Sequence, residues 1–128
     1  MNKKIPAILF LFLSISLFAQ TDGDKKYLKS SVEEGAKNCP VALDEKTTMV
    51  TMAYNYAFNI MEYQFTFDGV LANDFKVLKK SELINKWRTT PDQNKLIKFY
   101  KFKLNYIYHD LSGNFLTKIT ISPEEVLN

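Results

Sequence analysis

The stretch MEYQFTF, residues 61–67, alternates strictly between two sets of side chains. Its odd positions are apolar or aromatic, whereas its even positions are Glu62, Gln64 and Thr66. Successive side chains of a strand point to opposite faces, so this alternation is typical of a strand with one buried face. A helix would scatter Glu62 and Gln64 around its circumference. The segment therefore predicts a β-strand that buries Met61, Tyr63, Phe65 and Phe67.

Three further segments fit the same period of two. Residues 50–56 and 102–109 carry apolar side chains at their even positions, and residues 115–121 follow a turn-forming segment that contains Gly113. Short strands that are separated by turn residues indicate hairpins. We expect the buried sets to be Val50, Met52, Tyr54 and Tyr56 in the first segment and Phe102, Leu104, Tyr106 and Tyr108 in the second.

The remaining segments have helical spacing. We expect a first helix over residues 24–36, which Asn38 and Pro40 end, a second from Ser81, and a short third helix that Thr90 and Pro91 begin. Pro123 is expected to end the regular structure. The predicted inner faces are Leu28, Val32 and Ala36 in the first helix, Leu83, Ile84 and Trp87 in the second, and Leu96, Phe99 and Tyr100 in the third.

The predicted order is helix, β-hairpin, one or two helices, β-hairpin. This order predicts an α+β domain in which a four-stranded antiparallel sheet carries helices on one face and leaves a polar face open to solvent. The pattern does not fix the order of the strands in the sheet.

The first 19 residues have the parts of a secretory signal peptide. Lys3 and Lys4 precede an apolar run, and Ala19 is a small residue at the expected cut. We expect residues 1–19 to be removed and residues 20–128 to form a single exported domain, periplasmic or secreted, that meets a membrane only through its signal peptide. Removal of Lys3 and Lys4 lowers the 17 basic residues to 15 against 14 acidic ones. The mature protein therefore has no strong basic field for nucleic acid.

Two short motifs carry a resemblance. Asn38, Cys39, Pro40, Asp44 and Thr47 match N-x-C-P-x-x-x-D-x-x-T with one residue of slack, and Tyr106, Tyr108, Asp110 and Gly113 form Y-x-Y-x-D-x-x-G. With the paired aromatic strands, these motifs resemble a family of small bacterial proteins that carry signal peptides and have no characterised function. The resemblance implies a single exported α+β domain and supplies no activity. Further cysteines in that family could pair at the Cys39 position, but this chain has none.

Cys39 and His109 form the one possible cysteine–histidine couple, because the chain has one residue of each type. A nucleophilic thiol needs a base or a positive charge that lowers its pKa, together with an oxyanion hole. Pro40 removes one backbone donor beside Cys39, and free cysteine is often buried. A packed, inert thiol is therefore favoured over intermolecular pairing and over catalysis.

Two other segments invite a site hypothesis. His109 and Asp110 could suggest a metal or a general base, but residues 110–114 also have the composition of a hairpin turn. Residues 98–103, KFYKFK, alternate lysine with aromatics as single-strand binders do, although the aromatics also fit a buried stripe. We assign no catalytic, cofactor-binding or metal-binding residue and expect no cofactor.

The function that these observations favour is a non-enzymatic binding protein whose partner is an unknown protein or small ligand, reached through the open sheet face or an edge strand. Two alternatives stay open. One is a small exported thiol-dependent hydrolase that uses Cys39 and His109, and the other is an accessory protein of envelope assembly.

Overall fold

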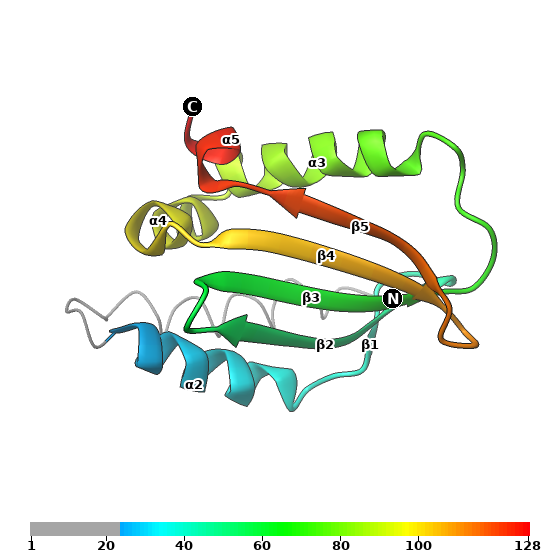
Figure 1. The fold of residues 1–128 in the computed structure, drawn as a ribbon, viewed down its shortest axis with the longest axis horizontal. Helices are drawn as coiled ribbons and strands as arrows, with labels where there is room; N and C mark the ends of the chain where they lie inside the picture. The colour runs from blue at the N-terminus through cyan, green and yellow to red at the C-terminus, as the bar shows by residue number, and fades with distance from the viewer. Residues whose placement is uncertain (1–23) are drawn as a thin grey trace.

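The computed structural model describes residues 24–128, so the predicted signal peptide at residues 1–19 lies outside the described residues. Figure 1 shows the helices and strands of this part of the chain. In chain order they are α2 (Asp24–Ala36), β1 (Val41–Ala42), β2 (Thr47–Asn55), β3 (Ile60–Phe67), α3 (Phe75–Thr89), α4 (Pro91–Tyr100), β4 (Lys103–Asp110), β5 (Phe115–Ile121) and α5 (Pro123–Leu127).

The sheet has five strands in the order β1-β2-β3-β4-β5 and is mixed. The α+β class is confirmed, but the prediction of four antiparallel strands is wrong in two respects. The two-residue strand β1 pairs with β2, and the central strands β3 and β4 run parallel. Parallel neighbours need a crossover connection, and α3 and α4 form that connection between them.

The core lies on one face of this sheet. Cross-strand neighbours form continuous rows, such as the row of Met52, Tyr63, Tyr106 and Ile119. All four helices of the described chain add side chains to the same cluster, among them Leu28, Trp87, Leu96 and Val126. α2 lies along β2, while α3 lies along β5 at the other side of the sheet (Figure 1). The sheet centre is therefore flanked by two helices.

The predicted buried set of β2 is wrong at both ends. Val50 is 41% exposed and Tyr56 is 40% exposed, whereas Met49 is buried. At Val50 the cause is an irregularity between Met49 and Thr51 in the pairing of β2 with β3, whereas Tyr56 lies in the turn after Asn55, the last residue of β2. A bulge of this kind adds one residue to one strand and reverses the alternation from that point. Met52 and Tyr54 lie beyond the bulge and are buried as predicted.

Two helix boundaries also differ from the sequence-based prediction. α3 begins at Phe75 rather than at Ser81. Its first turn includes Val77 and Leu78, which are exposed, so apolar residues occur all around this helix and its period is hard to recognise. Pro123 does not end the regular structure but begins α5, where Ser122 and Glu125 form a reciprocal capping box.

Candidate functional site

Cys39 lies between α2 and β1 and is part-buried against the hydrophobic core. Burial raises the pKa of its thiol above the ordinary value, which reduces the thiolate fraction at neutral pH. Its backbone N–H donates to the carbonyl of Ala36 at 3.0 Å. These features describe a packing residue at a chain reversal.

His109 belongs to β4, next to Tyr108, whose side chain joins the core face. Because neighbouring side chains of a strand alternate, the His109 ring lies on the opposite face, where it meets the Phe115 ring edge-on at 6.0 Å. Cys39, in contrast, packs against the core. Within residues 24–128 no hydrogen bond joins the Cys39 thiol to His109. The fold does not bring the two together.

The segment after His109 is a closed hairpin turn. One carboxylate oxygen of Asp110 accepts from the backbone N–H of Ser112 at 2.9 Å and from that of Asn114 at 2.8 Å. Gly113 has a φ of +91°, which favours glycine. These hydrogen bonds lower the pKa of Asp110. In the described part of the chain no group of three or more His, Cys, Asp or Glu residues could hold a metal ion.

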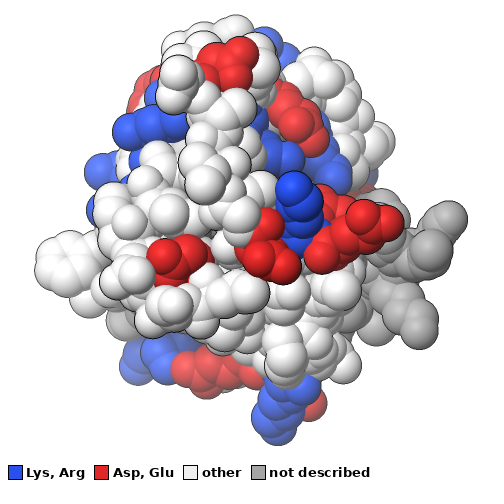
Figure 2. All heavy atoms as spheres, turned by 90° about the vertical axis from the view of Figure 1, so that its right-hand side faces the viewer, with Lys and Arg blue, Asp and Glu red and all other residues white. Residues whose placement is uncertain are grey.

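The lysine–aromatic segment at residues 98–103 spans the end of α4 and the start of β4. Tyr100 and Phe102 are buried in the core, so their faces are not free to stack on bases. Phe99, predicted to lie on the inner stripe, is 51% exposed. The opposite end of the molecule, at the right of Figure 1, faces the viewer in Figure 2, where basic and acidic side chains are interspersed. That face has no field of a single sign.

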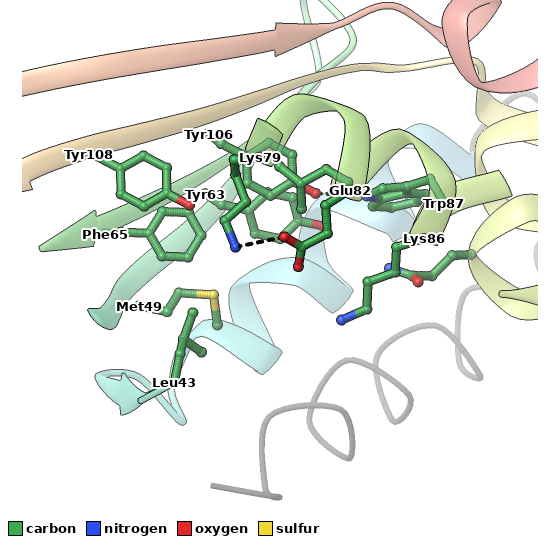
Figure 3. Close-up of a pocket in the computed structure, with 12 residues that line it drawn as sticks. Leu43, Met49, Tyr63, Phe65, Lys79, Glu82, Lys86, Trp87, Tyr106 and Tyr108 are labelled. Carbon is green, nitrogen blue, oxygen red and sulfur yellow. Dashed lines mark hydrogen bonds and ion pairs between the residues drawn. The ribbon is translucent and has the colours of Figure 1, made fainter. Parts of the chain in front are cut away.

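A concave site among the described residues is a pocket that the sequence reasoning did not find. It lies between α3 and the sheet centre and has a volume of about 130 Å³. β3 and β4 form its floor, α3 forms one wall, and residues from the β1–β2 region and α4 complete it (Figure 3). Its lining includes Tyr63, Phe65, Lys79, Glu82, Leu83, Lys86, Trp87, Gln93, Tyr106 and Tyr108.

Stacked aromatic rings form the floor. The rings of Tyr63 and Tyr106 are stacked with centroids 4.9 Å apart, and those of Phe65 and Tyr108 with centroids 4.7 Å apart. The register explains the stacking, because Tyr63 is paired with Tyr106 and Phe65 with Tyr108 across the parallel strands. The result is an apolar surface with phenol hydroxyls along it.

The pocket also holds polar groups. Trp87 Nε1 donates to the Tyr106 hydroxyl at 2.7 Å, which joins α3 to β4. Burial raises the pKa of Tyr63, Tyr106 and Tyr108, so these phenols stay neutral at physiological pH. The Tyr63 hydroxyl and the Gln93 amide have no hydrogen-bond partner in the part of the chain that the structure describes.

Three charged side chains of α3 stand at the rim. Lys79 Nζ lies 3.4 Å from a carboxylate oxygen of Glu82, and Figure 3 shows Lys86 apart from this pair. Lys86 forms no ion pair with any residue in the range 24–128. The rim therefore has one paired and one unpaired lysine.

No helix in residues 24–128 is both long enough and apolar enough to cross a membrane. No curated protein matches the sequence. Three solved structures share the fold. The first, a Pseudomonas aeruginosa protein provisionally described as secreted, has a TM-score of 0.67 at 12% identity, and the match covers 84% of this chain and 99% of that one.

The other two solved structures are pilotins of type 2 secretion systems. The Vibrio vulnificus pilotin EpsS has a TM-score of 0.60 at 10% identity, with 84% of this chain and 99% of that chain covered. The Vibrio cholerae pilotin AspS has a TM-score of 0.54 at 7% identity, with 95% and 98% covered. At these identities the likeness establishes the fold alone. A family match spans residues 22–117, and the chain accordingly belongs to the family described as Domain of unknown function (DUF8479).

Proposed function

We propose that this protein is an exported, non-enzymatic binding protein that holds a segment of a partner polypeptide in the pocket beneath α3. The observation that carries the proposal is the pocket itself, in which stacked aromatic rings are combined with polar groups that have no partner in the described chain. A concave apolar site with a few convergent polar groups is the usual form of a binding site.

The size of the pocket favours a side chain as its occupant. Sites for small molecules have volumes of about 300–1,000 Å³, whereas an apolar cavity of about 150 Å³ holds a single benzene ring. At about 130 Å³, this pocket holds one large side chain while the rest of the partner stays outside. Interfaces commonly obtain most of their affinity from a few such anchors.

The cellular role that we propose is that of an accessory protein in envelope assembly. The predicted signal peptide supports export, and two proteins with this fold are pilotins of type 2 secretion systems. Export is tested by mass spectrometry of protein from the envelope or the medium. We expect its chain to begin near Gln20, and soluble cytoplasmic protein that retains Met1 would contradict export.

The thiol-hydrolase alternative gains no support from the positions of its two residues. The pKa of the Cys39 thiol is raised by burial, which is the wrong direction for a nucleophile. His109 lies on the sheet face opposite the core against which Cys39 packs.

Site-specific photocrosslinking in the producing cells tests the proposed function. A photoreactive phenylalanine analogue replaces Lys86 at the pocket rim or, as the matched control, Lys76, an exposed lysine of α3 that does not line the pocket. We expect a discrete adduct from position 86 and not from position 76. Mass spectrometry of the adduct identifies the bound segment of the partner.

A pocket-filling variant provides the second control. Leu83→Trp places a larger side chain in the pocket wall and should abolish the adduct from position 86, while urea unfolding verifies that the variant is folded. Equal adducts from positions 76 and 86, or an adduct that the filled pocket still forms, would contradict the proposal.

A further inference from the structure

Two nearly buried polar side chains that line the pocket would lose contact with water when an occupant enters. Gln93 is 5% exposed and Tyr63 is 4% exposed, and neither side chain donates or accepts a hydrogen bond within residues 24–128. Covering such groups with a purely apolar side chain leaves them unpaired, which costs free energy. An occupant with a hydrogen-bonding atom at the tip of its ring avoids this cost.

The size of the pocket limits the ring. A six-membered ring fits a cavity of about 150 Å³, and this pocket is of similar size, at about 130 Å³. The stacked floor of Tyr63, Phe65, Tyr106 and Tyr108 offers aromatic faces and edges to a further ring. A phenol combines the required ring with the required polar tip.

The charged side chains at the rim favour a partner segment that carries a negative charge. Glu82 is the one carboxylate among the lining residues and is already paired with Lys79. Lys86 has no such partner in the described chain, so it is the rim charge without a counter-charge, while Asp44 also interacts electrostatically with Lys79. A carboxylate beside the anchor of the partner would complement this charge.

We infer that the partner segment is acidic and anchors a tyrosine side chain in the pocket, with a neighbouring carboxylate against Lys86. The inference rests on the proposed function and specifies the chemistry of its occupant. In this arrangement the Tyr63 hydroxyl and the Gln93 amide face the phenol group of the anchor. The Lys86 ammonium faces the carboxylate of the partner segment, which stays outside the pocket.

Blocked peptides of equal length test the inference on the full mature chain. They carry tyrosine, phenylalanine or alanine at the anchor and glutamate, glutamine or lysine a few residues away. Trp87, the one tryptophan of the sequence, lines the pocket and reports binding through its fluorescence, and amide NMR shifts locate the site. We expect the tyrosine–glutamate peptide to bind tightest, with phenylalanine weakening binding by about threefold to tenfold. Glutamine in place of glutamate should weaken it by about threefold.

Three variants assign these preferences to their residues. Tyr63→Phe should reduce the preference for tyrosine over phenylalanine, since it removes only a hydroxyl. Lys86→Glu should reverse the preference, so that the lysine peptide binds more tightly than the glutamate peptide. Lys98→Glu changes an exposed lysine of α4 outside the pocket and should leave the order of the peptides unchanged.

The outcomes separate this inference from the proposed function. Binding at the pocket with phenylalanine equal to tyrosine, or glutamine equal to glutamate, would overturn the inference while the pocket remained a polypeptide site. Failure of every peptide to bind at millimolar concentration would also overturn it, and the crosslinking experiment would then decide the proposed function by itself. A Lys98→Glu variant that reverses the preference between the glutamate and lysine peptides as strongly as Lys86→Glu does would show a general effect of net charge. That result would overturn the assignment of this preference to Lys86 at the rim.

Discussion

Asn59 connects two turns that are far apart in the sequence. Its φ of 56° is left-handed, a conformation that asparagine tolerates better than most residues. The Tyr54 hydroxyl donates to its side-chain oxygen, and its Nδ2 donates to the carbonyls of Tyr100 at 3.0 Å and Lys101 at 3.2 Å. Its own carbonyl accepts from the backbone N–H of Lys103 at 3.0 Å. One side chain therefore joins the β2–β3 turn to the α4–β4 connection.

Replacement of Asn59 should destabilise the fold. Asn59→Ala loses these side-chain hydrogen bonds and places a Cβ in a left-handed conformation without compensation, so we expect a loss of about 2–3 kcal/mol in the free energy of unfolding. Asn59→Gly loses the same bonds but tolerates the φ angle, and should be more stable than the alanine variant by about 1 kcal/mol. Urea unfolding measures both. An alanine variant as stable as the parent would contradict this role.

The Cys39 thiol should react slowly, as expected of a side chain that packs against the core. The thiol is part-buried and its pKa is raised, so iodoacetamide should label the native protein slowly at neutral pH and the unfolded protein quickly. Cys39→Ala should retain binding at the pocket, and Cys39→Ser should be less stable than Cys39→Ala because a poorly paired hydroxyl replaces the thiol. Fast labelling of the native protein that His109→Ala abolishes would instead revive the thiol-enzyme hypothesis.

At the scale of the element, β3 offers a direct comparison of its two faces. Phe65 is 5% exposed and stacks on Tyr106 and Tyr108, whereas Gln64 points to the other face and donates to Glu62 at 2.7 Å. Phe65→Ala should cost about 3–5 kcal/mol as a large-to-small change in the core. Gln64→Ala should stay within about 0.5 kcal/mol. Equal losses in chemical denaturation would mean that the faces are assigned wrongly.

The sequence predicted the elements whose patterns are local. The alternation in β3 and β4 marked their inner faces correctly at Tyr63, Phe65, Tyr106 and Tyr108. In a regular strand, an odd or even position in the sequence decides which face of the sheet a side chain joins. The bulge in β2 left no such mark and turned Val50 away from its expected face, while Tyr56 is exposed because β2 ends at Asn55. α5 was missed even though Ser122 and Glu125 have the spacing of a capping box, a signature that can be read in a sequence.

The parallel pairing and the pocket escaped prediction for the same physical reason. Both depend on how the segment between β3 and β4 crosses the sheet, which is a tertiary property that no local period specifies. This crossover makes the central strands parallel, and its helix α3 also supplies the wall residue Leu83 and the rim residues Lys79, Glu82 and Lys86. The sequence pattern identified the aromatic floor and a helix with Leu83 and Trp87 on its inner face, but not that this helix lies over the floor.

At the scale of the whole molecule, the candidate site lies over the sheet centre rather than on the open face or at an edge strand, where a binding surface was expected. α2 and α3 occupy opposite sides of the core face, and the central strands β3 and β4 supply the floor between them. A rigid sheet holds the floor residues in fixed register, which suits a site that must present several groups together. The helix wall carries Lys86, which is exposed and forms no ion pair in the described chain.

The number of buried phenols gives the whole molecule a characteristic response to alkali. Burial raises the pKa of Tyr54 and Tyr100 to about 12 and raises that of Tyr63, Tyr106 and Tyr108 as well. Tyrosines of the unfolded chain ionise near pH 10, so above that pH the unfolded state releases protons that the folded state retains. The stability from these neutral phenols is fully present below pH 10 and is lost as the pH rises through the folded-state pKa values.

We therefore expect the urea midpoint to change little with tyrosine ionisation between pH 7 and 9 and to fall progressively between pH 10 and 12. Tyr63→Phe removes one of the contributing phenols, so its midpoint should fall less steeply than that of the parent over the same interval. The tyrosinate absorbance of the five buried phenols should rise only as the urea midpoint collapses, because these phenols ionise with unfolding. A midpoint that stays constant up to pH 12, or ionisation of all tyrosines near pH 10 in the folded protein, would show that these rings are not held in the core.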